Sequence, residues 1–218
     1  MISDERLDQA ARLYDRAVFG ADADAIPAAD RCLDAVEADL AMARGRNLHA
    51  RFLAEGVAEE GELTLFSRAD ELYEALGDMR GRADAQFWIG TYQQLMRGDA
   101  EAARPFFERA LELAEQADDD LIRSYALRHL GILAHMAGRL AEARAWLEES
   151  TALRRKLNFR AGVAANLVGL AYIAAQEGRE DDAVATLAEA ERLATETESH
   201  GVLRWVADAM LKLRSTSV

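Results

Sequence analysis

The histidines and the cysteine are the side chains of this sequence best suited to metal binding or nucleophilic chemistry, and their spacing supports neither. His129 and His135 lie on different faces of a predicted helix, which excludes a metal-binding pair. Cys32 lies between Asp30 and Asp34, whose negative charges oppose formation of a thiolate. Because free cysteine is usually a small buried side chain, we expect Cys32 to have a structural role.

The sequence motifs of common enzyme classes are also missing. There is no G-x-x-x-x-G-K-[ST] or G-x-G-x-x-G sequence to form a phosphate-binding loop. There is no H-E-x-x-H, C-x-x-C or G-x-S-x-G sequence either. The 39 acidic residues are scattered, and none falls where the pattern predicts a desolvated carboxylate. We therefore expect a protein that is not an enzyme and that holds no metal and no cofactor.

Two short acidic runs could be interpreted as cation sites, at residues 118–120 (Asp-Asp-Asp) and 180–182 (Glu-Asp-Asp). Each run comes directly before a predicted helix. Carboxylates at a helix N-terminus accept hydrogen bonds from backbone N–H groups that have no partner within the helix. Helix capping is therefore the favoured interpretation of both runs.

The composition favours an all-α protein. Half of the residues are hydrophobic and only 2 are proline, so a sizeable core and long helices are both permitted. Alanine, leucine, arginine and glutamate dominate, and all four are good helix formers. Valine and isoleucine are sparse, which argues against a sheet.

The charge and the hydropathy pattern exclude several classes of partner. A net charge of −13 argues against binding to nucleic acid and to anionic membranes, which both need a basic surface. No run of 18 apolar residues predicts a transmembrane helix. Residues 1–16 lack the basic start and apolar stretch of a signal peptide. We expect a cytoplasmic protein, and the excess of alanine and arginine suggests a bacterial source.

A 40-residue repeat runs through the second half of the chain. Columns of similar residues recur at this step: a glycine (Gly98, Gly138, Gly178), an alanine (Ala103, Ala143, Ala183), a large apolar residue (Phe107, Leu147, Leu187) and a small residue (Ala110, Ser150, Ala190). Spacings of three and four residues predict one buried stripe on each helix. The glycines are suited to end the first helix of each pair. Since one helix pair cannot bury its stripe alone, the pairs must stack.

This pattern resembles the tetratricopeptide repeat (TPR) family. Gly131, Ala143, Leu147 and Ser150 match the spacing of that family best. The repeat is longer than the usual length of about 34 residues, and is similar to repeats that accompany bacterial transcriptional regulators. The resemblance implies an α-α superhelix, a right-handed solenoid of about five helix pairs followed by a C-terminal capping helix.

We predict a single TPR-like domain over residues 1–218. Residues 1–83 form divergent helices and a weak repeat that ends in Phe66, Ala69 and Leu72. Residues 84–198 form three clear repeats, and residues 199–213 form the capping helix. In the divergent part we expect separate helices over residues 4–19, 27–43 and 43–57. The hydrophobic period predicts roughly eleven helices in all.

In this family the first helix of each pair lines a concave groove. Removing the core positions leaves a predicted set of groove residues: Arg51, Trp88, Tyr92, Met96, Tyr125, Arg128, His135, Tyr172 and Gln176. The terminal helix adds Trp205 and Asp208. Exposed aromatic, methionine and arginine side chains are typical of binding sites. If the register slips, however, Trp88 and Tyr92 pack between helix pairs instead.

The resemblance implies a binding module, either an adaptor or a regulatory protein that holds a peptide or protein segment in the groove. Arg51, Arg128 and His135 make this groove basic, which suits an acidic partner or one with an aromatic anchor. An alternative is a small-molecule-binding protein, a sensor or biosynthetic protein, whose aromatic pocket is closed by residues 1–45. A third interpretation is a homodimer formed through the apolar groove residues.

Overall fold

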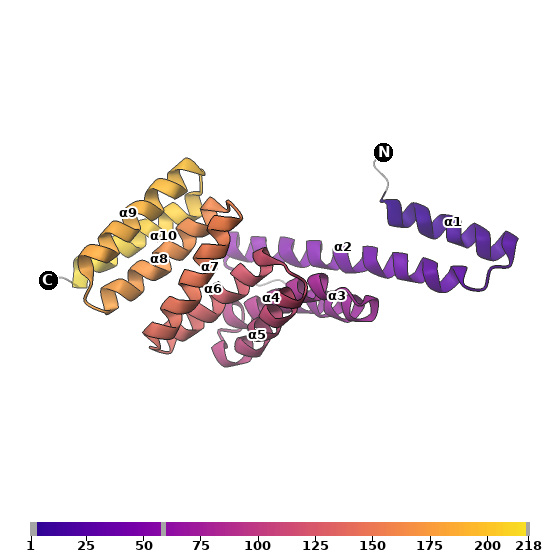
Figure 1. The fold of residues 1–218 in the computed structure, drawn as a ribbon, viewed down its shortest axis with the longest axis horizontal. Coiled ribbons are helices and arrows are strands. Elements are labelled where there is room, and N and C mark those ends of the chain that lie inside the picture. The colour runs from indigo at the N-terminus through magenta and orange to yellow at the C-terminus, as the bar shows by residue number, and fades with distance from the viewer. Residues whose placement is uncertain (1–3, 58–59, 217–218) are drawn as a thin grey trace. The chain divides into compact units, whose positions relative to one another are not determined.

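The computed structural model describes residues 4–57 and 60–216, and these form ten α-helices joined by short turns (Figure 1). The predicted all-α class is confirmed. The helices are α1 (Glu5–Gly20), α2 (Ala25–Glu55), α3 (Glu62–Leu76), α4 (Met79–Leu95), α5 (Ala100–Gln116), α6 (Asp120–Met136), α7 (Leu140–Lys156), α8 (Arg160–Gln176), α9 (Glu180–Glu196) and α10 (His200–Thr216).

The chain divides into two compact units, unit 1 (Met1–Leu113) and unit 2 (Ala114–Val218), with the boundary inside α5. Unit 1 contains α1 to α4 and most of α5. Unit 2 contains α6 to α10. The division at residues 83 and 198 that the sequence suggests stays a prediction.

In unit 1, α2 is one continuous helix of 31 residues, so the prediction of separate helices over residues 27–43 and 43–57 was wrong. No proline interrupts this stretch after Pro27. Gly45 lies inside the helix, at a position where α2 packs closely against α3. A Cβ atom at Gly45 would lie 2.5 Å from the ring of Phe66 on α3, whose side chain is fully buried. Gly45 therefore lets α2 and α3 approach closely without ending α2.

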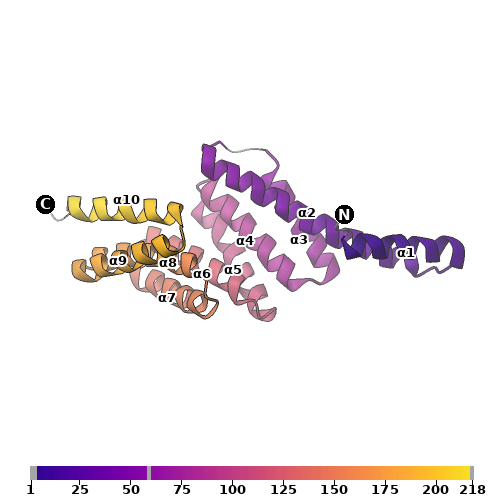
Figure 2. The same cartoon turned by 90° about the horizontal axis from the view of Figure 1, so that it is seen from above.

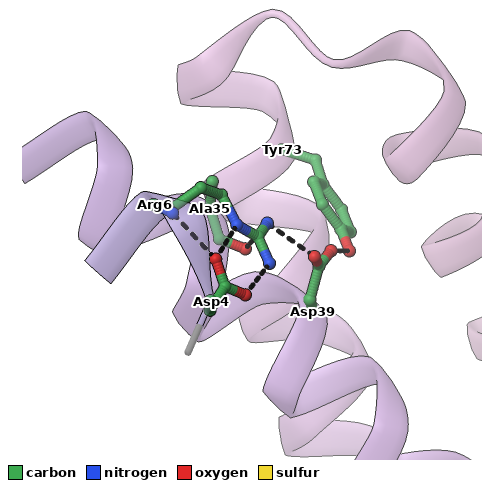
Figure 3. Close-up of polar contacts among 5 residues, drawn as sticks. All are labelled: Asp4, Arg6, Ala35, Asp39 and Tyr73. Carbon is green, nitrogen blue, oxygen red and sulfur yellow. Dashed lines mark hydrogen bonds and ion pairs between the residues drawn. The ribbon is translucent and has the colours of Figure 1, made fainter. Parts of the chain in front are cut away.

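A polar cluster joins α1 to α2 and α3 (Figure 3). The Asp4 carboxylate caps α1 by accepting from the backbone N–H of Arg6 at 2.9 Å. The Arg6 guanidinium donates to Asp4, to the Ala35 carbonyl and, at 2.6 Å, to Asp39. Tyr73 on α3 donates its hydroxyl to the other oxygen of Asp39 at 2.7 Å. Hydrogen bonds from Arg6 lower the pKa of Asp4 to about 2, and both carboxylates raise the pKa of Arg6.

Unit 2 is a regular stack of consecutive helix pairs, in which α6 packs on α7, α8 packs on α9, and α10 lies along α9 and α8 (Figure 2). Equivalent helices of successive pairs begin 40 residues apart, as the repeat predicted: α6, α8 and α10 begin at residues 120, 160 and 200. The small residues of the repeat lie where helices cross. A Cβ atom at Gly131 of α6 would lie 3.0 Å from Leu147 and 3.2 Å from the Ala143 carbonyl, both on α7.

The turns combine predicted and unpredicted features. Gly138 and Gly178 have positive φ angles, of 73° and 76°, as expected of glycines that end helices. Two residues after the ends of α5, α7 and α9 stand residues of three different types that also have positive φ: Asp118, Asn158 and Glu198. Sequence reasoning missed this column because the residue types differ.

The two acidic runs have different roles. Asp119 caps α6 by accepting from the backbone N–H of Ile122 at 2.9 Å, which confirms the capping interpretation for residues 118–120. The N-cap of α9 is Arg179, which makes no side-chain capping bond. Residues 180–182 were therefore wrongly predicted as capping residues. They lie in the first turn of α9, where their charges face the positive end of the helix dipole.

Candidate functional site

The predicted groove residues divide between the two units. Arg51, Trp88, Tyr92 and Met96 lie in unit 1, on α2, on α4 and at the C-cap of α4. The others lie in unit 2, on α6 and α8: Tyr125, Arg128, His135, Tyr172 and Gln176. Within unit 1, Arg51 is exposed near the end of α2, whereas Tyr92 and Met96 are half-buried.

Trp88 is a packing residue of unit 1. Its ring stacks on Phe66 with centroids 5.5 Å apart, and it meets the ring of His49 edge-on at 5.1 Å. The Arg46 guanidinium lies 5.8 Å from the Trp88 ring, and the indole is half-buried. This environment corresponds to the alternative in which Trp88 packs between helices.

Beneath Trp88, unit 1 buries a pair of titratable side chains. Nδ1 of His49 lies 3.1 Å from Oε1 of Glu62, and the two residues are 5% and 1% exposed. Burial raises the pKa of Glu62, and the charge and hydrogen bond of His49 partly oppose this shift. One carboxylate oxygen of Glu62 thus has a partner in the same core, and the other, Oε2, is buried without a hydrogen-bond partner among the described residues.

Unit 2 buries a different polar cluster, in which two arginines share one amide oxygen. Asn166 of α8 is fully buried. Its Oδ1 accepts from Nη1 of Arg128 on α6 and from Nη1 of Arg154 on α7, each at 3.0 Å. Its Nδ2 donates to the hydroxyls of Ser150 at 2.8 Å and Thr151 at 3.2 Å. Asn166 therefore positions both guanidiniums from a single site between three helices.

Arg154 is the more deeply placed of the two arginines, with an exposure of 2%. Nη1 also donates to the Gly162 carbonyl at 2.8 Å, and Nε donates to Oγ of Ser124 at 3.3 Å. The guanidinium lies 5.0 Å from the ring of Tyr125 and 5.4 Å from that of Phe159. Nη2 is buried without a hydrogen-bond partner among the described residues. Burial, and then the charge of Arg128, lower the pKa of Arg154 to about 9.

Arg128 is half-buried and lies closer to the surface of unit 2. Nη1 donates to the Ala165 carbonyl at 2.8 Å as well as to Asn166. The guanidinium lies 6.0 Å from the ring of Trp205 on α10, within the range of a cation–π contact. Burial lowers the pKa of Arg128 to about 10, so this side chain keeps its positive charge at neutral pH.

Within the described parts of the chain, no carboxylate pairs with Arg128 or Arg154. Two positive charges therefore share neutral acceptors in a protein whose net charge is −13. An uncompensated buried charge is costly, and an anion that reached Arg128 would reduce that cost. The candidate functional site is accordingly the Arg128–Asn166–Arg154 cluster, which we call the arginine cluster.

The same helices carry the remaining predicted residues. His135 lies two turns beyond Arg128 on one face of α6, roughly 10 Å along the axis. Its Nε2 is 3.1 Å from Oε1 of Gln176 on α8. The Tyr172 ring of α8 lies 5.5 Å from Nζ of Lys212 on α10. The structure thus pairs His135 with Gln176, and it brings Tyr125 to the arginine cluster through Arg154.

Sequence reasoning missed Arg154 and Asn166, although the repeat contains a signal for Arg154. The equivalent positions one repeat before and after are Ala114 and Ala194, both fully buried. An arginine in a column otherwise occupied by buried alanine indicates a charge that needs special partners. Asn166 stands in a column with Ala126 and Val206 and departs from its repeat in the same way.

A cavity of about 290 Å³ opens elsewhere in unit 2, between α7, α8 and α9. Three arginines line it, and each has a carboxylate partner. Arg144 pairs with Glu177, Arg155 pairs with Glu189 at 3.2 Å, and Arg179 pairs with Glu177 and Asp182. Because these charges are compensated, the cavity has less attraction for an anion than the arginine cluster has.

The described residues contain no group of three or more His, Cys, Asp or Glu side chains that could hold a metal ion. None of their helices is both long enough and apolar enough to cross a membrane.

Comparisons with known proteins support the fold. Residues 81–156 match the family model of the tetratricopeptide repeat. No curated protein matches the sequence. The structure is similar to the crystal structure of BtubC (BKLC) from P. vanneervenii, with a TM-score of 0.52 and 16% sequence identity. That match covers 90% of this chain and 93% of the other, and at this identity it shows the fold alone.

Proposed function

We propose that this protein is a non-catalytic binding module that holds an acidic peptide or protein segment, because residues 81–156 match the family model of the tetratricopeptide repeat. Repeats of this kind generally mediate protein–protein interaction. The proposed binding surface is the side of unit 2 formed by α6, α8 and α10 around the arginine cluster. The observation that carries the proposal is the absence of a carboxylate partner for Arg128 and Arg154 among the described residues.

Each residue of this surface has a distinct part in the proposal. Arg128 receives a carboxylate of the partner in a charge-assisted hydrogen bond. Arg154 is a positioning residue that donates to Asn166. Its charge, which lies deeper in the unit than Arg128, adds to the positive potential at the surface. Trp205 and Tyr172 supply aromatic surface beside the charge, and such side chains are common in binding sites.

The proposal also specifies which classes of partner the protein binds. With a net charge of −13, the partner is a protein segment and is neither nucleic acid nor an anionic membrane. The arginine cluster selects acidic segments against that background because opposite charges speed encounter and exclude wrong partners. The cytoplasmic location and the bacterial source remain predictions from composition.

The test is a binding titration with a short fluorescein-labelled peptide that carries several glutamates around one tryptophan. The control peptide has glutamine in place of each glutamate. We expect the full-length protein to bind the glutamate peptide more tightly, as measured by fluorescence anisotropy. Arg128→Gln should weaken that binding at least about tenfold, since a charge-assisted hydrogen bond contributes about 1.5–3 kcal/mol.

The matched control variant is Arg155→Gln, on α7 of the same unit. Arg155 is exposed and already pairs with Glu189, so its loss should leave peptide affinity nearly unchanged. The proposal is wrong if the two peptides bind equally well, or if Arg128→Gln and Arg155→Gln weaken binding to the same extent. Circular dichroism of each variant checks that the helices are retained.

A further inference from the structure

A second surface, in unit 1, is exposed and apolar. There α1 and the first half of α2 form an antiparallel hairpin whose helices pack through buried Ala10, Leu13, Ala25 and Ala29. Six large apolar side chains outside that packing have exposures from 44% to 58%, and Phe19 near the end of α1, outside this group, is 82% exposed. The six residues, which we call the hairpin face, are Leu7, Tyr14 and Val18 on α1 and Ile26, Leu33 and Leu40 on α2.

The residues of the hairpin face form two stripes that point to the same side. Spacings of seven and four place each stripe along one side of its helix. Tyr14 directly follows the buried Leu13, and Ile26 directly follows the buried Ala25. Successive residues of a helix are separated by about 100° around its axis. Each stripe is therefore turned about 100° away from the side of its helix that packs against the other helix. The two helices are antiparallel and face each other through their packing contacts. The same rotation from the contact therefore places both stripes on the same side of the hairpin.

Acidic residues border this face on both outer edges. Asp8 and Asp15 directly follow Leu7 and Tyr14, and they therefore lie on the edge of α1 away from α2. Asp30 lies at the corresponding edge of α2, four residues after Ile26. Glu37, four residues after Leu33, already pairs with Arg68 of α3 at 2.7 Å. By the same helical spacing, Arg12, Arg16 and Arg31 fall on the opposite side of the hairpin. Arg6 lies at the contact between α1 and α2, where it pairs with Asp4 and Asp39.

We propose that the hairpin face docks an amphipathic helix of a partner protein, one with an apolar stripe and basic residues on both flanks. Docking would complete a three-helix bundle by placing an apolar stripe along the two stripes of the hairpin. The α1 stripe spans roughly three turns, which suits a partner helix of about 14–18 residues. A second copy of this chain would place its acidic edges against the same acidic edges, and like charges oppose that pairing.

This proposal is independent of the proposed function of unit 2. The partner helix is basic and apolar, whereas the segment proposed for the arginine cluster is acidic. The two sites lie in different units and use different residues. Arg128→Gln should therefore leave helix docking unchanged, and substitutions in the hairpin face should leave binding of the glutamate peptide unchanged.

The test uses full-length protein and three labelled synthetic peptides of equal length. The first has leucine at helical spacing with lysine on both flanks. The second has the same composition with the leucines scrambled so that no stripe forms. The third has glutamate in place of lysine. We expect fluorescence anisotropy to show binding of the first peptide at least about tenfold tighter than of either other peptide.

Two matched leucine variants locate the site. Leu33→Gln lies in the hairpin face, whereas Leu53→Gln lies on the same helix beyond the hairpin and is 66% exposed. Leu33→Gln should weaken binding of the leucine–lysine peptide about tenfold, since it removes apolar contact area at the centre of the stripe. Leu53→Gln should bind like the unsubstituted protein. Both leucines are exposed, so both variants should keep the thermal unfolding midpoint, and Tyr14→Gln provides a second variant of the face.

The acidic residues at the edges of the hairpin face can be tested separately from its apolar residues. The double variant Asp15→Asn, Asp30→Asn should weaken binding of the leucine–lysine peptide and reduce its dependence on salt concentration. Equal binding of the scrambled peptide, or of the glutamate version, would overturn the proposal. A concentration-dependent dimer that Leu33→Gln converts to monomer in light scattering would also overturn it, because a second copy would then cover the face.

Discussion

The two units bury charge in opposite ways. In unit 1, His49 and Glu62 lie 3.1 Å apart beneath Trp88, so the buried carboxylate has a titratable partner. In unit 2, Arg128 and Arg154 both donate to the amide oxygen of Asn166. Both units are built from packed helices, yet the buried carboxylate of the first lies beside a basic side chain, whereas the buried guanidiniums of the second contact neutral acceptors.

This difference shows where each unit can interact. In the core of unit 1, His49 already contacts Glu62, and the surface that this unit offers to a partner is the apolar, acid-edged hairpin face. A core with two uncompensated guanidiniums gains electrostatic stabilisation from an anion. The arginine cluster is therefore suited to acidic partners and the hairpin face to basic ones.

The largest effect is expected from breaking the pair in unit 1. His49→Leu leaves the Glu62 carboxylate buried without its partner and should lower the free energy of unfolding by about 3–5 kcal/mol. The double variant His49→Leu, Glu62→Leu should recover most of that loss because no charge remains buried. Urea unfolding measures both. A single variant as stable as the unsubstituted protein would contradict the view that the pair is compensated.

The next largest effect is expected from supplying a carboxylate to the arginine cluster of unit 2. Asn166→Asp places a carboxylate at the atom position that both guanidiniums contact at 3.0 Å. The internal carboxylate should compete with a partner's carboxylate and weaken binding of the glutamate peptide at least about tenfold, which is 1.4 kcal/mol. Anisotropy titration gives the affinity, and Ser150→Ala provides a control in the same cluster that adds no charge. Unchanged affinity in Asn166→Asp would show that the peptide does not respond to the charge of the cluster.

A smaller effect compares helix crossings in the two units. Gly45→Ala in unit 1 should lower the free energy of unfolding by about 1 kcal/mol, because overpacking against the Phe66 ring exceeds the gain in helix propensity. Gly131→Ala in unit 2 meets its nearest neighbour at a longer distance, 3.0 Å, and should lower the free energy of unfolding by less. Thermal unfolding measures the pair. If Gly131→Ala destabilised the protein more than Gly45→Ala, the crossing of α2 and α3 would not be tighter than the crossing of α6 and α7.

The smallest effect concerns an arginine of unit 1 that has the acidic partners Arg128 lacks. Arg6 binds Asp4 and Asp39 and lowers the pKa of Asp4 to about 2 from its usual value of 3.8. A lowered carboxylate pKa stabilises the fold above the usual pKa, and this contribution is lost as pH falls from about 4 to about 2. NMR titration should show the Asp4 midpoint near pH 2. In Arg6→Gln the midpoint should return toward pH 3.8, and an unchanged midpoint would mean that Arg6 is not the cause.

Much of the fold was predictable because its signals are local or periodic. The 40-residue columns predicted the helix pairs of unit 2, and Gly131 lies at a close helix crossing as its column required. Gly138 and Gly178 end their helices with positive φ, and Asp119 caps α6. Each of these features depends on a few neighbouring residues or on a regular spacing that the sequence displays directly.

The candidate site was only partly predictable. Arg128 was identified from its register on a first helix, and its contacts with Asn166 and Trp205 place it in the arginine cluster. The role of Trp88 was left open, and packing against Phe66 and His49 is decided by contacts between helices. The continuity of α2 was missed because the weak repeat suggested a break where no local stop signal exists.

The sequence by itself determined the class of fold, the period of its repeats and the overall negative charge. The tertiary structure decided which charges are compensated. Arg154 lies 12 residues from Asn166, and Arg128 lies 38 residues from it, yet all three meet between α6, α7 and α8. A sequence lists every acid and base, but the energy of a buried charge depends on which groups surround it. That environment exists only after the helices have packed.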